Sequence, residues 1–160
     1  MQVPTTSTFD ALVPGASWRS AGRTLGESDL AHACMTSGDW HPIHADGVYA
    51  AGTPLGQRIF QGTYGLHVAV GMASAFPPVA DDVIGALGLS EWRYQAPLFV
   101  GDTVHVEVEI VAKRRTSDGG RGVLERRIRL IKQDGSVAQQ GLVQTLLKAA
   151  PLAPAAVELT

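Results

Sequence analysis

Residues 103–115, TVHVEVEIVAKRR, decide the class of fold because apolar and polar side chains alternate along them. An extended chain turns successive side chains to opposite faces, so this period of two places all the apolar side chains on one face. The apolar positions are Val104, Val106, Val108 and Ile110, and the polar ones between them are His105, Glu107 and Glu109. The stretch therefore predicts a β-strand with one face in the core and one in water.

Turn sequences divide the chain around this strand into further strands. SDGG and QDGS precede the segments 122–132 and 137–148, and Gly and Asp at such positions favour tight antiparallel turns. An earlier strand is expected within residues 85–102 and a short first strand within residues 16–24. We expect a three- or four-stranded antiparallel meander, and one face of this sheet needs an apolar cover.

Two helices are predicted before the meander. In residues 26–39, GESDLAHACMTSGD, the apolar Leu30, Ala33 and Cys34 have the i, i+3, i+4 spacing of a helix that begins after Gly26 and ends near Gly38. A second helix is expected over residues 62–76, before Pro77 and Pro78, and its composition predicts burial on all sides. Early helices followed by a meander indicate an α+β fold, in which the second helix covers the sheet.

Composition bounds the class of protein. The 160 residues predict one domain over residues 1–160, with a loose N-terminal arm at about 1–12 and an Ala/Pro-rich tail at about 150–160. A net charge of -2 gives no reason to expect nucleic acid or a membrane surface as partner. No signal peptide and no apolar run of about 20 residues are found. The single cysteine, Cys34, excludes an intramolecular disulfide and fits a reducing, cytoplasmic setting.

The segment SGDWHPIHAD, residues 37–46, holds the candidate chemistry. Pro42 fixes one backbone angle and biases His41 to extended geometry, so the turn is stiff, and Asp39 and His44 can point into one small space. A carboxylate beside an imidazole can hold and polarise one water molecule. Such a pair can take a proton from water and return one on the same face of a substrate, which suits addition of water to a double bond.

Two other interpretations of this segment remain open. In one, Asp39 only caps a turn and His44 is a structural histidine. In the other, His41 and His44, flanked by Asp39 and Asp46, bind a metal ion. The proline argues against the regular helical spacing of zinc sites, and we expect no metal.

The start of the second helix offers a further group. Backbone N–H groups near Gly62, in QGTYG, are free at a helix N-terminus and carry its positive end, which suits the oxygen of a thioester carbonyl. His67 lies one and a half turns later, and a lone histidine on an apolar helix is more often a core residue than a catalyst. A group of basic residues is assigned to a solvated sheet edge, with contact to carrier phosphates as the alternative. These are Lys113, Arg114, Arg115, Arg121, Arg126, Arg127 and Arg129.

Residues 36–59, TSGDWHPIHADGVYAAGTPLGQRI, resemble the hydratase signature of the MaoC-like, R-specific enoyl-CoA hydratases, which reads S/T-G-D-x-N-P-I/L-H-x-D and later T-x-F/L-G-x-R-I. Residues 23–39 and 93–114 extend the resemblance, which covers roughly residues 15–148. It implies a hotdog fold, in which a sheet wraps a long helix and two copies dimerise into one continuous sheet.

The resemblance also implies an activity: reversible addition of water to a trans-2-enoyl thioester, on CoA or an acyl carrier protein, giving the (R)-3-hydroxyacyl thioester without metal or organic cofactor. The family's catalytic aspartate and histidine fall on Asp39 and His44, and its carbonyl-binding glycine falls on Gly62.

The chain departs from the family pattern at three positions. His41 replaces an asparagine, Gln61 replaces the histidine before the helix glycine, and His67 replaces a helix serine. These changes reshape the surroundings of the pair and of the carbonyl site, so Gln61, His41 and His67 are expected near the substrate. Two alternatives stay open: a thioesterase that attacks the carbonyl, and a non-catalytic acyl-thioester-binding subunit of a heteromeric hydratase.

Overall fold

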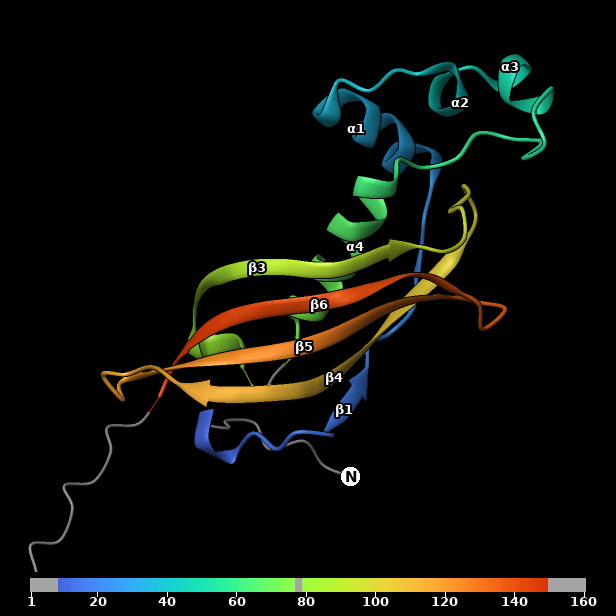
Figure 1. Ribbon diagram of the computed structural model, residues 1–160. Helices are drawn as coiled ribbons and strands as arrows, with labels where there is room; N and C mark the ends of the chain where they lie inside the picture. Colours follow the sequence, from blue (N-terminus) through green and yellow to red (C-terminus); the bar gives the residue numbers. More distant parts are fainter. Residues whose placement is uncertain (1–8, 77–78, 150–160) are drawn as a thin grey trace, which may run out of the picture.

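A six-stranded antiparallel sheet forms the body of the protein (Figure 1). The computed structural model describes residues 9–76 and 79–149. The strands are β1 (Ser17–Arg19), β2 (Arg23–Thr24), β3 (Val83–Tyr94), β4 (Thr103–Arg115), β5 (Arg121–Lys132) and β6 (Val137–Lys148). They lie in the order β1-β4-β5-β6-β3, and β2 also pairs with β4.

The predicted meander is confirmed for β4, β5 and β6, which the two predicted turns connect. The position of β3 differs from a consecutive meander, because β3 pairs with β6 and not with β4. Alternation of side chains shows which face of a strand is buried, but it does not show which strand lies beside it. Arg126, Arg127 and Arg129 on β5 therefore lie in the middle of the sheet and not at its edge. Lys113, Arg114 and Arg115 lie on the part of β4 that extends beyond its pairing with β1, so among the described residues they are at a sheet edge as expected.

The helix α4 (Gly62–Ser74) lies across the inner face of the sheet. Its buried Val68, Ala69 and Ala73 share one core cluster with the inner face of β4 and β5. The alternation predicted for β4 is confirmed: Val104, Val106 and Val108 are 0% exposed and Ile110 is 1% exposed. Burial of the helix on all sides is wrong, because one face packs on the sheet and no part of residues 9–76 and 79–149 covers the other. Thr63, His67, Val70 and Ser74 are exposed.

Three helices precede α4 and lie beyond one end of the sheet (Figure 1). They are α1 (Glu27–Ser37), α2 (Pro42–Ala45) and α3 (Gly47–Ala51). The predicted limits of α1 are confirmed: the Gly26 N–H donates to the Asp29 carboxylate at 2.8 Å, and Gly38 ends the helix with a φ of 71°. A positive φ is a conformation that glycine adopts without strain, so Gly38 sets the direction in which the next residues leave α1.

The expected N-terminal arm is shorter than predicted. The short 3-10 helix η1 (Phe9–Ala11) begins a packed segment in which Phe9 is 2% and Leu12 is 5% exposed. Their side chains join Phe76, Leu124 and Leu147 in a second core cluster. Residues 1–8 and the predicted tail at about 150–160 lie outside the described residues. No helix in the described part is long and apolar enough to cross a membrane.

Candidate active site

Asp39 lies in the turn that connects α1 to α2. Its backbone N–H donates to Ser37 Oγ at 3.1 Å, and its Oδ1 accepts a hydrogen bond from the His41 N–H at 3.2 Å. The carboxylate is thus held by its own turn, as is usual for aspartate at such positions. The side chain is 47% exposed, so one side of it is open to solvent.

His44 lies on α2, and a backbone hydrogen bond fixes the orientation of its ring. Its Nδ1 is 2.7 Å from the carbonyl oxygen of Ile59. Because a carbonyl only accepts, Nδ1 carries the proton, and Nε2 is left as an acceptor in the neutral ring. Nε2 faces Asp39 Oδ2 at 3.5 Å, and the His44 side chain is 11% exposed.

The sequence thus brings Asp39 and His44 together as expected, at a distance longer than a good direct hydrogen bond. The Asp39 carboxylate and His44 Nε2 both accept hydrogen bonds. One water molecule can therefore donate a hydrogen bond to each of them. The arrangement can therefore orient a water molecule and take up its proton.

His41 caps α2 and lies beside the pair. Its Nδ1 accepts a hydrogen bond from the Ile43 N–H at 3.2 Å. Its ring lies edge-on to those of His44 and Tyr49, with centroid distances of 6.3 and 6.1 Å. His41 thus fixes the turn that presents His44, which a family asparagine can also do as a helix cap.

A metal site is not formed by these side chains. Asp46 accepts from the N–H groups of Val48 and Tyr49 and caps α3. Among residues 9–76 and 79–149, no group of three or more His, Cys, Asp or Glu side chains is placed to hold a metal ion.

Gln61 lies on the side of Asp39 that faces the backbone of the turn. Its side chain is buried, and its Nε2 donates to the carbonyl oxygen of Asp39 at 3.1 Å and to Cys34 Sγ at 3.3 Å. Its Oε1 is buried and has no hydrogen-bond donor within the described chain. Gln61 thus connects α1, the Asp39 turn and the start of α4, and its expected contact with substrate stays a prediction.

Gly62 is the first residue of α4 and borders a cavity. The cavity has a volume of about 320 Å³, and Tyr94, Pro97, Leu98 and Gln139 are among the residues that line it. A Cβ at position 62 would lie 3.0 Å from Tyr94 Cε1, so only glycine leaves this ring undisturbed. Gln139 Nε2 donates to the Gly62 carbonyl at 3.0 Å, and Gly62 is the first residue of a 13-residue helix, whose first N–H groups have no partner within the helix and carry its positive end.

His67 is separate from this group. It lies on the exposed face of α4 and stacks on Tyr64, with a centroid distance of 6.1 Å. Its assignment to the core is therefore wrong, and within the described chain it contacts neither Asp39 nor His44.

Sequence reasoning also missed several groups. The Ile59 carbonyl that orients His44 carries no signal in the sequence, because every residue has one. Gln139 and Tyr94 come from strands far along the chain, and only the sheet brings them to Gly62.

Comparison with known proteins shows the family of this chain. The family model described as "MaoC like domain" matches residues 11–128, which include Asp39, His44 and Gly62. The chain belongs to the MaoC-like domain family. The resemblance found in residues 36–59 is thereby confirmed.

Relatives of this MaoC-like chain include hydratases. The chain is 31% identical over 111 residues to the "Protein MaoC" of Klebsiella aerogenes, covering 68% of this chain and 31% of that protein. It therefore spans about a third of the length of that relative. It is 27% identical over 119 residues to the "(R)-specific enoyl-CoA hydratase" of Aeromonas caviae, covering 74% of this chain and 84% of the relative.

Solved structures establish the fold. The A. caviae (R)-hydratase structure superposes with a TM-score of 0.69 at 27% identity, covering 87% of this MaoC-like chain and 98% of the other. A Mycobacterium tuberculosis protein with a double hotdog fold superposes with a TM-score of 0.80 at 21% identity, covering 94% of this chain and 46% of the other. The predicted α+β hotdog fold is confirmed.

Proposed function

We propose that this chain is an enoyl-thioester hydratase and dehydratase. It would add water reversibly to a trans-2-enoyl thioester, carried by CoA or an acyl carrier protein, to give the (R)-3-hydroxyacyl thioester. The observation that carries the proposal is the Asp39–His44 pair, 3.5 Å apart, with His44 held in one tautomer by the Ile59 carbonyl. The A. caviae (R)-specific hydratase among the relatives supports the same reaction class.

The proposed mechanism uses three groups of the chain. Asp39 and His44 Nε2 hold the water, whose oxygen bonds to the β-carbon while its proton passes to the pair. The α-carbon receives a proton from the pair on the same face, so addition is syn. The Gly62 N–H stabilises the negative charge that develops on the thioester oxygen. No metal or organic cofactor takes part in this scheme.

The active form is proposed to be a homodimer. In the described part of the chain, the edge strand β3 has no strand on its outer side, and most of its large apolar side chains are exposed. These are Val83, Ile84, Leu87, Leu89 and Tyr94. A second copy paired along β3 would continue the sheet, remove an edge that otherwise favours aggregation, and cover apolar surface. Tyr94 also borders the Gly62 cavity, so dimerisation would affect the substrate site.

Substitution of the pair tests the proposal. Asp39→Asn and His44→Ala are each expected to lower the rate of trans-2-enoyl-CoA hydration by about 100- to 10,000-fold, the usual cost of losing a general acid or base. The loss of enoyl absorbance measures this rate. Asp46→Asn is the matched control, because Asp46 caps α3 and an asparagine can cap a helix as well.

Two results would contradict the proposal. One is near wild-type hydration by both Asp39→Asn and His44→Ala. The other is release of free thiol from acyl-CoA without loss of the enoyl absorbance, which would identify a thioesterase.

A further inference from the structure

His41 is bonded through its backbone to both members of the candidate catalytic pair. Its N–H donates to Asp39 Oδ1 at 3.2 Å, and its carbonyl oxygen accepts from the N–H of His44 at 2.8 Å. Its side chain is exposed and lies at the N-terminus of α2, the four-residue helix that carries His44. His41 is therefore placed to position Asp39 and His44 relative to each other.

The side chain of His41 caps this helix. Its Nδ1 accepts the hydrogen bond of the Ile43 N–H at 3.2 Å and so satisfies one of the first N–H groups of α2, which have no partner within the helix. Pro42 has no N–H, so the Ile43 N–H is the first one that α2 presents to a cap. A helix of four residues has few backbone hydrogen bonds of its own, so the cap contributes much of what orders it.

The cap requires a neutral ring. An imidazole whose Nδ1 accepts a hydrogen bond carries its proton on Nε2, whereas both nitrogens of an imidazolium are donors. Protonation of His41 turns a ring N–H toward the N–H of Ile43, and the hydrogen bond between them is lost. The His41 side chain is open to solvent, so a proton reaches it directly. An asparagine, which the family pattern has at this position, caps a helix through an oxygen that does not titrate.

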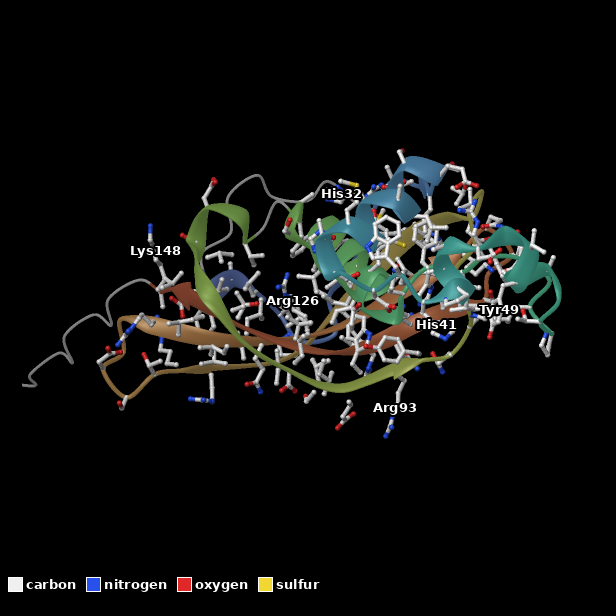
Figure 2. The ribbon with its side chains drawn as sticks, turned by 90° about the horizontal axis from the view of Figure 1, so that it is seen from above. His32, His41, Tyr49, Arg93, Arg126 and Lys148 are labelled. Atoms are coloured by element: carbon white, nitrogen blue, oxygen red, sulfur yellow. The ribbon has the colours of Figure 1, made fainter. Side chains whose placement is uncertain are left out.

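Titratable side chains face His41 from each element next to it. They are Asp39 in the α1–α2 turn, the ring of His44 on α2 at 6.3 Å, and the ring of Tyr49 on α3 at 6.1 Å. Figure 2 shows His41 and Tyr49 on the helix side of the sheet, whereas Arg93 lies on the opposite side. A positive charge on His41 thus favours the ionised Asp39 carboxylate and opposes protonation of His44.

Two effects of a proton on His41 act in opposite directions on the neutral, active form of His44. Repulsion between two imidazolium rings 6.3 Å apart in water changes proton binding by roughly a factor of three and keeps His44 neutral. Loss of a helix cap changes the equilibrium that orders the helix by roughly a factor of ten. The loss of the cap is the larger effect, so activity decreases.

We propose that His41 is a proton-sensitive positioning residue of the catalytic pair. Neutral His41 caps α2 and holds His44 facing Asp39, and protonated His41 releases the cap. The hydratase therefore loses activity toward acid pH beyond the loss that protonation of His44 itself causes. This inference rests on the proposed function, because it takes Asp39 and His44 as the catalytic pair. His41 acts through the helix and does not touch the substrate.

The first test compares kcat for hydration of crotonyl-CoA by the wild type and by His41→Asn from about pH 8 to pH 5, the range in which imidazole titrates. The titration of His44 is common to both proteins, so it largely cancels in the ratio of their rates. The ratio of wild type to His41→Asn is expected to fall about threefold toward acid pH, a tenfold loss of the cap less the threefold effect of repulsion. His32→Asn, at an exposed histidine of α1, is the control, and its ratio should stay constant. A His41→Asn ratio that stays constant or rises toward acid pH overturns the proposal.

His41→Ala separates proton sensitivity from a purely structural role. It removes the cap at every pH, so kcat should be about tenfold below wild type at about pH 8 and only about threefold below it at about pH 5. His41→Asn should restore most of the loss at the higher pH, because asparagine is a good cap. An equal deficit of His41→Ala at both pH values would show that the cap does not respond to protons and would refute the proposal.

NMR of the inactive His44→Ala protein detects the cap without any catalysis. The Ile43 amide proton is expected to move upfield as the pH falls from about 8 to 5, with the same midpoint as the His41 ring, because it loses its hydrogen bond. This movement should be absent in His41→Asn/His44→Ala. An Ile43 amide that does not follow the His41 ring overturns the proposal even if the wild type hydrates enoyl thioesters. An amide that follows it, in a protein whose wild type hydrates none, supports the proton-sensitive cap and refutes the proposed hydratase.

Discussion

Three glycines of α4 test how closely this helix approaches the sheet. A Cβ at Gly65 would lie 2.0 Å from Gln139 Nε2 and 2.8 Å from Leu98 Cδ1, whereas a Cβ at Gly71 would meet nothing within 4 Å. Gly62 is intermediate, with the ring of Tyr94 3.0 Å away. We therefore predict that Gly65→Ala destabilises the protein and that Gly71→Ala on the same helix does not.

The magnitude follows from the contacts of Gln139. Its Oε1 accepts from Trp92 Nε1 and its Nε2 donates to the Gly62 carbonyl, and a methyl at position 65 displaces this amide. Overpacking costs about 1–3 kcal/mol, and each lost hydrogen bond about 1 kcal/mol. Alanine recovers up to about 1 kcal/mol of helix propensity. Gly65→Ala should lose about 2–4 kcal/mol, and Gly71→Ala should gain about 0.5–1 kcal/mol.

Urea denaturation at one fixed protein concentration measures both free energies of unfolding. A thermal scan should move by about 2–4 °C for each kcal/mol in a chain of this size. The double variant Gly65→Ala/Gln139→Ala should recover part of the loss, because the shortest contact is removed. The reasoning is refuted if Gly65→Ala unfolds at or above the urea midpoint of Gly71→Ala, since α4 would then not lie against Gln139.

Two further predictions concern the site and the core. Gln61→Leu removes the amide that donates a hydrogen bond to the Asp39 carbonyl oxygen. It is expected to lower kcat about tenfold with little change in KM, because a tenfold change corresponds to the free energy of about one hydrogen bond. Gln61→His should restore part of kcat, and steady-state kinetics that show only a raised KM would count against a positioning role. Burial acts to raise the pKa of Asp102, but hydrogen bonds from Gln133, Lys132 and the Phe99 N–H outweigh it, so the pKa lies below its ordinary value of 3.8. A lowered folded-state pKa means that the ionised form stabilises the protein above pH 3.8 and that this contribution is lost as the pH falls further. Asp102→Asn leaves Lys132 without its 2.9 Å ion pair and should cost about 3–5 kcal/mol at pH 7. Urea denaturation at pH 7 and pH 2.5 checks this, and a difference from wild type that does not shrink at the lower pH would contradict it.

Local patterns predicted most of the secondary structure. The alternation in β4 and the glycines at both ends of α1 appear in the structure as expected, because strand faces and helix ends depend on neighbours in the chain. The pairing of β3 with β6 and the exposure of one face of α4 were not predictable in this way. Both depend on which segments lie side by side, and this is settled by packing of the whole sheet.

The sequence itself contained a signal at Arg126 that was overlooked. Arg126 lies in phase with Leu124, Ile128 and Leu130, so the alternation of β5 predicts that it faces inward. Its grouping with the neighbouring arginines as one solvated surface was wrong because composition was considered without the strand period.

The sequence by itself determined the α+β class, the stiff turn that carries Asp39 and His44, and the glycine that begins α4, because each depends on a few adjacent residues. The tertiary structure decided the rest. It brings the Ile59 carbonyl to His44, Gln61 to the back of Asp39, and the strands around Gly62 and Arg126. These groups are separated by up to tens of residues along the chain, and only burial of the common core between α4 and the sheet brings them together.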